Sequence, residues 1–513
     1  WFRLNYLAFH LQPAGWHLMG ALLHAVASLL VFRVLLRISR DHFISAVAAM
    51  LFAVHPIHIE SVAWVSGTTD PLMCVFLLGA LLCFLRWMEQ GGVAQLAAPA
   101  VLFALSLLCK EPAIMLLPFL ALWVWIAPEA KNARGRLLLR GVLPLAVVAG
   151  AYLAVRTAVL HGAAHAVNPI SWTQMLLTLP AVVFFYVRQP VMPLGLSFAY
   201  EMPAQSAPSA EFFWIPVLAL LVVSALFGVW CWRAARYRAT LIAAAAFWML
   251  WLLPLWNLRW LPREELVHDR YLYLPVLGVC LAVGVALAQW KEALAGEETA
   301  PRVAETAVAP TVTQPLLPPS ARPGMVAALL VLALLAGTFS QELDCATDLL
   351  LWSRAYRVAP NSVVALSNFA TVLFEHRRMD EGFALMQRTL ELEPDSRVAT
   401  YNMAYALHNL HNDRAAEPYA ERAVELSQQG AAALRLLGVI ELNLGRPEAA
   451  EGLLRRAVAR APQGEGFHVA LAAVLLQRGD RTGAEQEARN ELCLFPESSV
   501  ARQVLVQLRA GQR

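Results

Sequence analysis

The chain has 513 residues, of which 59% are hydrophobic and only 15% are charged. This composition lies outside the range of soluble globular proteins and predicts a membrane protein. The formal net charge of +3 is too small to favour a nucleic-acid partner. The seven cysteines form no disulfide pattern and no zinc-binding spacing. Because the chain begins at Trp1 and not at Met, we expect its true N-terminus, including one membrane helix, to lie upstream.

The first part of the chain is a succession of apolar runs with charges clustered between them. A membrane-spanning helix needs about 20 mainly apolar residues. By this measure we predict spans over residues 16–36, 44–62, 70–88, 93–109, 112–126, 141–160, 213–232, 239–256, 269–289 and 325–340. The stretch 172–188 is also apolar, but Pro180 and Arg188 interrupt it. We therefore predict a re-entrant or interfacial segment there.

The basic residues predict how these spans are oriented. They gather in loops that fall on one side if the spans alternate and residues 172–188 do not cross: Arg37, Arg40, Arg86, Lys131, Arg134, Arg136, Arg140, Arg233, Arg236 and Arg238. Cytoplasmic loops carry the excess of Lys and Arg, so this side is the cytoplasm. Residues 1–290 are then a polytopic membrane domain. Residues 291–323, rich in Pro, Ala and Thr, are a disordered cytoplasmic linker, and residues 324–341 form the last span.

Residues 345–513 have a different organisation. Pro360, Pro394, Pro462 and Pro496 lie on a period of 34 residues, and Gln428 stands where the series would place another proline. This period is typical of tetratricopeptide repeats. The predicted units are 363–396, 397–430, 431–464 and 465–498, with small residues wherever paired helices approach: Ala370, Ala404, Gly438 and Ala472, then Gly382, Ala416, Ala450 and Ala484. The fold class is therefore all-α: a polytopic membrane domain followed by a repeat solenoid.

A stack of such repeats forms a superhelix with a concave groove. Such a groove usually binds a peptide or a protein, and the alternative is a spacer or dimerisation arm. The predicted topology places the repeats outside the cytoplasm. Short outer loops and unpaired cysteines favour a bacterial inner membrane with the repeats in the periplasm, over an endoplasmic reticulum membrane of the same topology.

One polar motif begins at His55 and contains His58, Glu60 and Trp64, with Asp70 shortly after it. We expect these side chains near the outer membrane face. Ionisable groups at that depth are costly to bury and are functional candidates. The alternative is an interfacial anchor formed by Trp64, with polar groups that satisfy one another.

A second polar motif, His268-Asp269-Arg270-Tyr271, enters a predicted span from the outside. The planar fork of an arginine at a membrane interface suits a phosphate or lipid-phosphate headgroup. Lys110 is a further charged point on the same face and can meet a second phosphate oxygen. The alternatives are ion pairs, of Arg270 with a carboxylate and of Lys110 with Glu111. The chain contains no P-loop and no Gly-rich nucleotide fingerprint, so we expect no nucleotide cofactor.

Four segments resemble one known family. They read FRLNYLAFHLQPAGWHLMGALLHAVASLLVFRVLLR, LFAVHPIHIESVAWVSGTTDPL, LCKEPAIMLLP and DRYLYLP, in this order and ahead of the repeats. The chain thus resembles the transmembrane and tetratricopeptide repeat-containing proteins, which are glycosyltransferases of the C-type fold related to protein O-mannosyltransferases. The resemblance implies transfer of a sugar, with mannose expected, from a polyprenyl-phosphate donor to a protein hydroxyl outside the cytoplasm. The repeats would bind the acceptor.

The resemblance also implies roles for individual residues. An acidic motif in the family's first external loop acts as catalytic base and helps to hold a divalent metal, and it is expected upstream of Trp1. Within this chain, Glu60 and Asp70 are the remaining catalytic candidates. Donor-phosphate binding is expected of Arg270, Lys110 and Tyr271. The outer-face polar cluster would comprise His55, His58, Trp64, His268 and Asp269. The family carries a basic residue near Thr68 and Thr69, which this chain lacks.

Two other functions are compatible with the sequence. One is a non-catalytic membrane scaffold whose repeats recruit envelope proteins. The other is a ligase of lipid-linked glycans, which would be expected to use basic residues in a large late external loop. The loop 257–268 is small for that role.

Overall fold

The computed structural model describes residues 1–160, 169–299 and 319–510. Throughout these residues the secondary structure is helical, with no β-strand, which confirms the all-α prediction. The chain divides into two compact units, Trp1–Val358 and Ala359–Arg513. We call them the membrane unit and the repeat unit.

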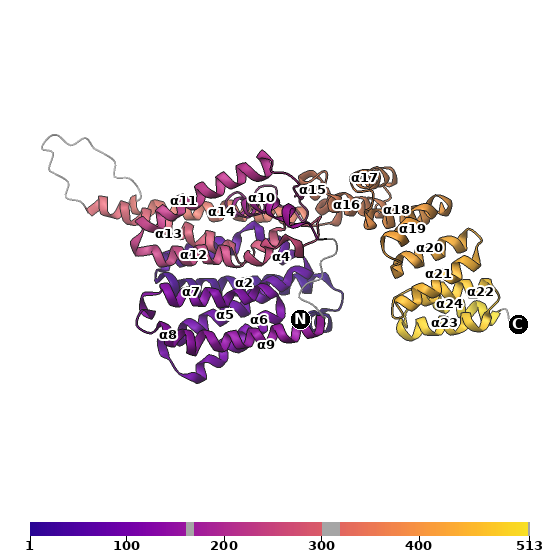
Figure 1. Ribbon diagram of the computed structural model, residues 1–513, viewed down its shortest axis with the longest axis horizontal. Helices are drawn as coiled ribbons and strands as arrows, with labels where there is room; N and C mark the ends of the chain where they lie inside the picture. The colour runs from indigo at the N-terminus through magenta and orange to yellow at the C-terminus, as the bar shows by residue number, and fades with distance from the viewer. Residues whose placement is uncertain (161–168, 300–318, 511–513) are drawn as a thin grey trace. The chain divides into compact units, whose positions relative to one another are not determined.

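The membrane unit consists of long helices joined by short helical turns. Its α-helices are α1 (Phe2–Phe9), α2 (Pro13–Ser39), α3 (His42–Val54), α4 (Ile59–Ala63), α5 (Thr69–Gln90), α6 (Ala97–Cys109), α7 (Leu116–Ile126), α8 (Arg134–Leu137), α9 (Leu143–Leu160), α10 (Trp172–Val191), α11 (Ile215–Arg233), α12 (Arg238–Leu250), α13 (Val276–Thr299), α14 (Arg322–Asp344) and α15 (Asp348–Val358). Figure 1 shows most of the long ones running roughly parallel to one another.

Within the described residues, six stretches are long and apolar enough to cross a membrane: Pro13–Ser39, Val65–Gln90, Arg134–Leu160, Ala210–Arg233, Val276–Gly296 and Pro319–Asp344. A seventh is possible if the bent pair His42–Val54 and Pro56–Ala63, which meet at 48°, is one span. The chain is therefore an integral membrane protein. Two of our predicted spans appear as shorter apolar helices, Ala94–Cys109 and Glu111–Ile126.

Two predicted spans differ from the structure, and the segment predicted to be re-entrant or interfacial is a regular helix. The predicted span 239–256 ends as an α-helix at Leu250 and continues as a 3-10 turn, Leu253–Trp256, that contains Pro254. The predicted span 269–289 begins later, at Val276, because Pro275 lies directly before it and residues 269–272 form a separate 3-10 turn. Residues 172–191 form one continuous helix, α10, which begins with a capping box formed by Ser171 and Gln174.

The predicted linker 291–323 is helical at both ends, in α13 up to Thr299 and from Pro319 onward. Residues 300–318, which we predicted to be disordered, lie outside the described part. The helix α15, which we assigned to the repeats, is grouped with the membrane unit. It follows α14 closely, and Arg354 at its centre lies 3.6 Å from the carboxylate of Asp344.

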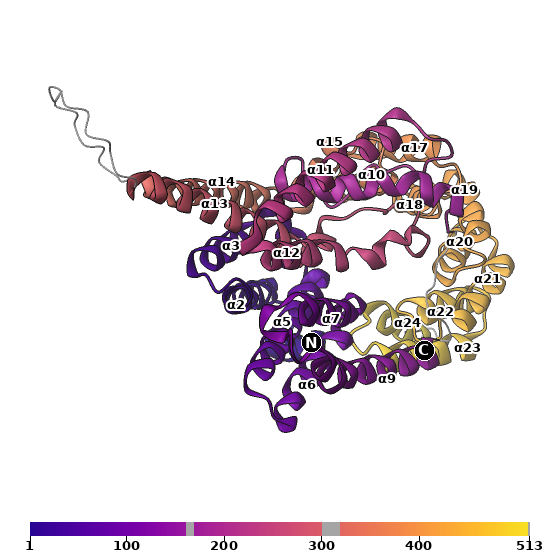
Figure 2. The same ribbon diagram turned by 60° about the vertical axis from the view of Figure 1, so that its left-hand side comes forward.

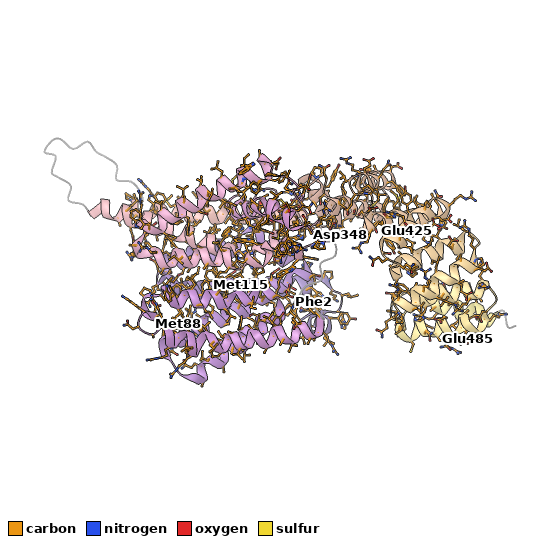
Figure 3. All side chains as sticks on the ribbon, in the orientation of Figure 1. Phe2, Met88, Met115, Asp348, Glu425 and Glu485 are labelled. Atoms are coloured by element: carbon orange, nitrogen blue, oxygen red, sulfur yellow. The ribbon has the colours of Figure 1, made fainter. Side chains whose placement is uncertain are left out.

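Close packing around α13 brings distant segments together. A Cβ atom added at Gly284 would lie 2.9 Å from the carbonyl oxygen of Ile44, and one at Gly278 would lie 2.2 Å from that of Ala244. Any larger residue at these positions would force α3 or α12 away from α13. Figure 2 shows α13 beside α14. The Arg270 motif lies shortly before the N-terminal end of α13, so this packing positions the backbone next to the candidate site.

The repeat unit is a row of antiparallel helix pairs (Figure 1). Its helices are α16 (Val363–Glu375), α17 (Met379–Leu392), α18 (Arg397–Asn409), α19 (Asp413–Leu426), α20 (Ala431–Asn443), α21 (Pro447–Arg460), α22 (Phe467–Gln477), α23 (Arg481–Leu494) and α24 (Ser499–Ala510). The small residues predicted at the helix contacts are buried: Ala370, Ala404, Ala416, Ala450, Ala472 and Ala484 are all 0% exposed. The repeat solenoid is confirmed.

Candidate functional site

The first polar motif folds into a broken helix. His55 ends α3, and Pro56 opens a 3-10 turn, Pro56–His58, that leads into α4. The Nδ1 atom of His55 accepts the backbone N–H of Ile57 at 3.3 Å, and its Nε2 atom lies 3.0 Å from the carbonyl oxygen of Pro190. These two contacts assign a neutral imidazole that carries its proton on Nε2. His55 therefore caps the 3-10 turn that follows it and also binds α10 through a hydrogen bond.

Glu60, on α4, points to the second motif. Its Oε2 atom accepts the backbone N–H of Arg270 at 2.9 Å, and its Oε1 atom accepts Nη1 of the same residue at 3.0 Å. The carbon Cζ of Arg270 also lies 5.0 Å from the ring centre of Trp64 and 5.3 Å from that of Tyr271. The guanidinium is thus held by one carboxylate and two aromatic rings.

His268 lies between two carboxylates. Its Nδ1 atom is 3.3 Å from Oε1 of Glu60, and its Nε2 atom is 3.7 Å from Oε2 of Glu265. Burial opposes the charged imidazolium, but the two carboxylates outweigh burial, and the pKa of His268 is raised above its ordinary value. The neighbouring Arg270 acts against this shift.

Asp269 connects the turn that contains Arg270 to α10 and to the segment that follows α10. Its carboxylate accepts the side-chain amide of Gln189 at 3.1 Å, the backbone N–H of Ser197 at 3.2 Å and the hydroxyl of Tyr200. Burial, and then the nearby charge of Glu60, raise the pKa of Asp269 to about 7. In the His268–Arg270 segment, His268 and Arg270 thus both contact Glu60, whereas Asp269 binds Gln189, Ser197 and Tyr200.

Asp70 and Lys110 form a second charged pair at this site. The Nζ atom of Lys110 is 2.6 Å from Oδ1 of Asp70, and Ser61 donates to the other carboxylate oxygen at 3.4 Å. The Nζ atom also lies 5.7 Å from the centre of the Tyr271 ring. The ring of Tyr271 thus contacts both cations, Lys110 and Arg270.

A cavity of about 770 Å³ opens beside these residues. Charged side chains contribute to its wall: Asp70, Lys110, Glu111, Arg156 and Arg270. The rest of the wall is largely apolar or aromatic and includes Met73, Met115, Leu153, Trp251, Trp260 and Leu274. A cavity of this kind suits a ligand that joins an anionic group to a hydrocarbon chain.

The structure separates the predicted site residues into two groups. Asp70, Lys110, Arg270 and Tyr271 line the cavity. The others do not: Glu60, His268, Asp269 and Trp64 lie around Arg270, His55 binds α10, and His58 is buried at 3% exposure. The ring of His58 packs against those of His24, Phe52 and Tyr273 at 4.5 to 4.8 Å between centres.

Sequence reasoning missed Arg156, which lines the cavity and pairs with Glu111 at 2.8 Å. It is the single charged residue in the apolar run 141–160, a signal that identifies functional candidates in membrane segments. It also missed Tyr273, whose hydroxyl lies 2.8 Å from Nδ1 of His24. Nothing in the local sequence indicates that contact, because the two residues are 249 positions apart.

The residues present do not by themselves form a site for a divalent metal. No group of three or more His, Cys, Asp or Glu side chains with suitable geometry exists in residues 1–160, 169–299 and 319–510. The two candidate carboxylates, Glu60 and Asp70, each face a cationic side chain instead.

The sequence is similar to a known protein family and to known proteins. Residues 7–159 match the family model described as dolichyl-phosphate-mannose-protein mannosyltransferase. Protein O-mannosyl-transferase Tmtc2 of Drosophila melanogaster is 36% identical over 222 residues, which are 40% of this chain and 23% of that protein. Protein O-mannosyl-transferase TMTC3 of Mus musculus is 27% identical over 324 residues, 55% of this chain and 34% of that protein.

Among solved structures, the chain is similar to the crystal structure of YrrB, a TPR protein with an unusual peptide-binding site. The identity is 18%, the similarity covers 36% of this chain and 90% of that one, and the TM-score of 0.27 is too low to support an argument. The matches to the two mannosyl-transferases cover about a quarter and a third of their own lengths. In sequence, the chain is therefore similar to proteins named protein O-mannosyl-transferase, over 40% and 55% of its own length for these two.

Proposed function

We propose that the membrane unit transfers a mannose residue from a polyprenyl-phosphate carrier to a hydroxyl group of a protein outside the cytoplasm. The repeat unit binds that acceptor protein. The observation that supports this function best is the cavity, which combines Lys110, Arg156 and Arg270 with a mainly apolar wall. The names of the relatives support the same reaction class.

The two parts of the donor match the two parts of the cavity. A polyprenyl phosphate carries one anionic group on a long hydrocarbon chain. Arg270 and Lys110, which both lie close to the ring of Tyr271, offer the N–H donors for the phosphate oxygens. The apolar side chains around Met115, Leu153 and Leu274 accommodate the first isoprene units.

In the reaction, the oxygen of the acceptor hydroxyl forms a bond to the anomeric carbon of the sugar. The bond between that carbon and the phosphate oxygen breaks, and the phosphate leaves with the electron pair. Because the phosphate gains negative charge in the transition state, Arg270 and Lys110 stabilise it. The hydroxyl proton passes to a carboxylate. Of the two candidates in this chain, Asp70 lines the cavity and Glu60 does not.

The repeats act by holding the acceptor near this cavity, which raises its local concentration. We place the protein in a bacterial inner membrane, with the repeats in the periplasm. The Lys and Arg residues of the opposite loops support this orientation.

The test is transfer of label from a radiolabelled polyprenyl-phosphate mannose to envelope proteins in membranes that contain the full-length protein. We expect label in protein with the wild type and a loss of at least about a hundredfold with Arg270→Ala. Arg263→Ala is the matched control, because Arg263 is exposed on the same loop and does not line the cavity. Equal transfer by Arg270→Ala would refute the phosphate role. No transfer from any sugar donor, with partners retained by the repeats, would favour the scaffold.

A further inference from the structure

Both carboxylate oxygens of Glu60 contact Arg270, and one of them also lies 3.3 Å from Nδ1 of His268. Oε2 accepts the backbone N–H of Arg270, and Oε1 accepts its Nη1 group, across 210 positions of sequence. Glu60 is only 4% exposed and does not line the cavity, whereas Arg270 does. Glu60 can therefore influence a ligand in the cavity only by way of its contacts with Arg270.

We propose that Glu60 is a positioning residue that fixes Arg270 for the donor phosphate and takes no proton from the acceptor. The proposal rests on the proposed function, because it assumes that Arg270 binds a phosphate. In this proposal, the polar motif that begins at His55 positions Arg270 and does not react with the substrate.

The backbone contact explains why a carboxylate is needed at this position. Arg270 is the second residue of the 3-10 turn Asp269–Leu272. The first N–H groups of a helical turn have no partner within it and require an acceptor from elsewhere. Glu60 supplies this acceptor and so fixes the main chain from which the arginine extends.

The side-chain contact restricts the guanidinium. Nη1 binds Glu60, while Trp64 and Tyr271 lie at 5.0 and 5.3 Å from Cζ. A guanidinium has five N–H donors, so the contact with Glu60 leaves others for a phosphate. An arginine without these contacts would lose rotamer freedom on binding, and pre-ordering removes that cost.

Contacts on both sides of Glu60 restrict the position of its backbone. His55 caps the bend before α4 and is tied to Pro190. A Cβ atom at Gly67 would lie 2.8 Å from the carbonyl oxygen of Glu60, so the following turn packs directly on its backbone. A proton on Glu60 would remove the negative charge that holds the guanidinium of Arg270.

The experiment measures binding and transfer separately in the purified full-length protein in nanodiscs. The binding probe is a polyprenyl monophosphate without sugar, titrated by calorimetry. The variants are Glu60→Gln, Glu60→Asp, Arg270→Ala and the double variant Glu60→Gln with Arg270→Ala, and Arg263→Ala is the control. Size-exclusion profiles and apparent Tm values identify variants that do not fold.

We expect Glu60→Gln to weaken binding of the monophosphate by roughly tenfold or more. Glu60→Asp should weaken it similarly, because the shorter side chain keeps the charge but cannot make both contacts. In the Arg270→Ala background, Glu60→Gln should have no further effect on affinity, because its effect passes through Arg270. The pH profile of the residual transfer should remain that of the wild type.

Four results would overturn the inference. Unchanged affinity in Glu60→Gln together with abolished transfer would make Glu60 a proton acceptor. Additive losses of affinity in the double variant would show that Glu60 does not act through Arg270. If the wild type binds no polyprenyl monophosphate at all, the proposed function fails, and the positioning role fails with it. A wild type that binds and a Glu60→Gln variant that binds equally well would refute the positioning role alone.

Discussion

The Nζ atom of Lys110 lies 2.6 Å from Oδ1 of Asp70, and both residues line the same cavity. The other two cations of the cavity are paired in the same way, Arg156 with Glu111 and Arg270 with Glu60. The donor phosphate would therefore meet cations that are already held in place by carboxylates. Such pairs reduce the cost of burying each charge and orient its remaining donors.

The first prediction concerns the pair of Asp70 and Lys110. Their side chains are only 6% and 22% exposed, so removal of one partner leaves the other charge poorly solvated. We expect Lys110→Met to destabilise the membrane unit by about 3 kcal/mol. Asp70→Asn together with Lys110→Met should recover most of the loss in stability, although not the transfer activity.

The measurement is the apparent Tm of the purified protein in detergent, for both single variants and the double variant. Arg263→Ala serves as the control for loss of one exposed cation. If the double variant is less stable than both single variants, the contact between Asp70 and Lys110 has no stabilising role.

The second prediction concerns Gly67, in the turn between α4 and α5. A Cβ atom there would lie 2.8 Å from the carbonyl oxygen of Glu60 and 3.1 Å from Cα of Ser61. We expect Gly67→Ala to push α4 away from the turn and to lower both the apparent Tm and transfer. Gly150→Ala is the matched control, because Gly150 lies in α9 with no atom within 4 Å of the added carbon. Equal behaviour of the two variants would contradict the close packing.

Much of this fold could be predicted from local sequence patterns. Apolar runs identified most of the long helices, and the period of 34 residues located the repeat helices from Val363 onward. Both signals are local, because a run of apolar residues or a repeat unit carries its own periodicity. The exceptions occur where proline interrupts a run. Pro254 and Pro275 displaced the predicted ends of two spans.

The candidate site was predicted in part. Arg270, Lys110 and Tyr271 were expected together, and they share the cavity. Both Glu60 and Asp70 were catalytic candidates by sequence, and no sequence pattern distinguishes the roles of the two carboxylates. Their difference depends on which partner each carboxylate faces across 210 and 40 positions of sequence. Such contacts arise from helix packing, which no local pattern reports.

The third prediction concerns the pH dependence of stability. The pKa of Asp269 is raised from 3.8 to about 7 by burial and by Glu60. The folded state therefore binds a proton more tightly than the unfolded state between these values, and stability falls as the pH rises through this range. The raised pKa of His268 acts in the same direction, because its stabilising contribution is lost as the pH rises through the folded-state pKa.

We therefore expect the wild type to have a lower apparent Tm at pH 8 than at pH 6, with a smaller difference in Asp269→Asn. Titratable groups that face this region include Glu60, Tyr186 and Tyr200. Tyr200→Phe removes the hydroxyl that donates to Asp269 without changing its charge, and it serves as the comparison variant. An unchanged pH dependence in Asp269→Asn would show that Asp269 does not carry it.

The last prediction concerns Gln428, the one position where the proline series of the repeats is broken. A consensus design would place proline there. The structure indicates the opposite, because Gln428 has a φ of 50° and its N–H donates to the carbonyl oxygen of Glu425 at 3.0 Å. Proline fixes φ near −65° and has no N–H to donate.

We expect Gln428→Pro to destabilise the repeat unit by more than about 1 kcal/mol. Gln428→Gly should stabilise it slightly, because glycine adopts a positive φ without strain. Hydrogen exchange of α19 and α20 in the full-length protein measures both effects, with faster exchange expected for proline and slower exchange for glycine. Slower exchange in Gln428→Pro would mean that the turn accepts the conformation found in the other units.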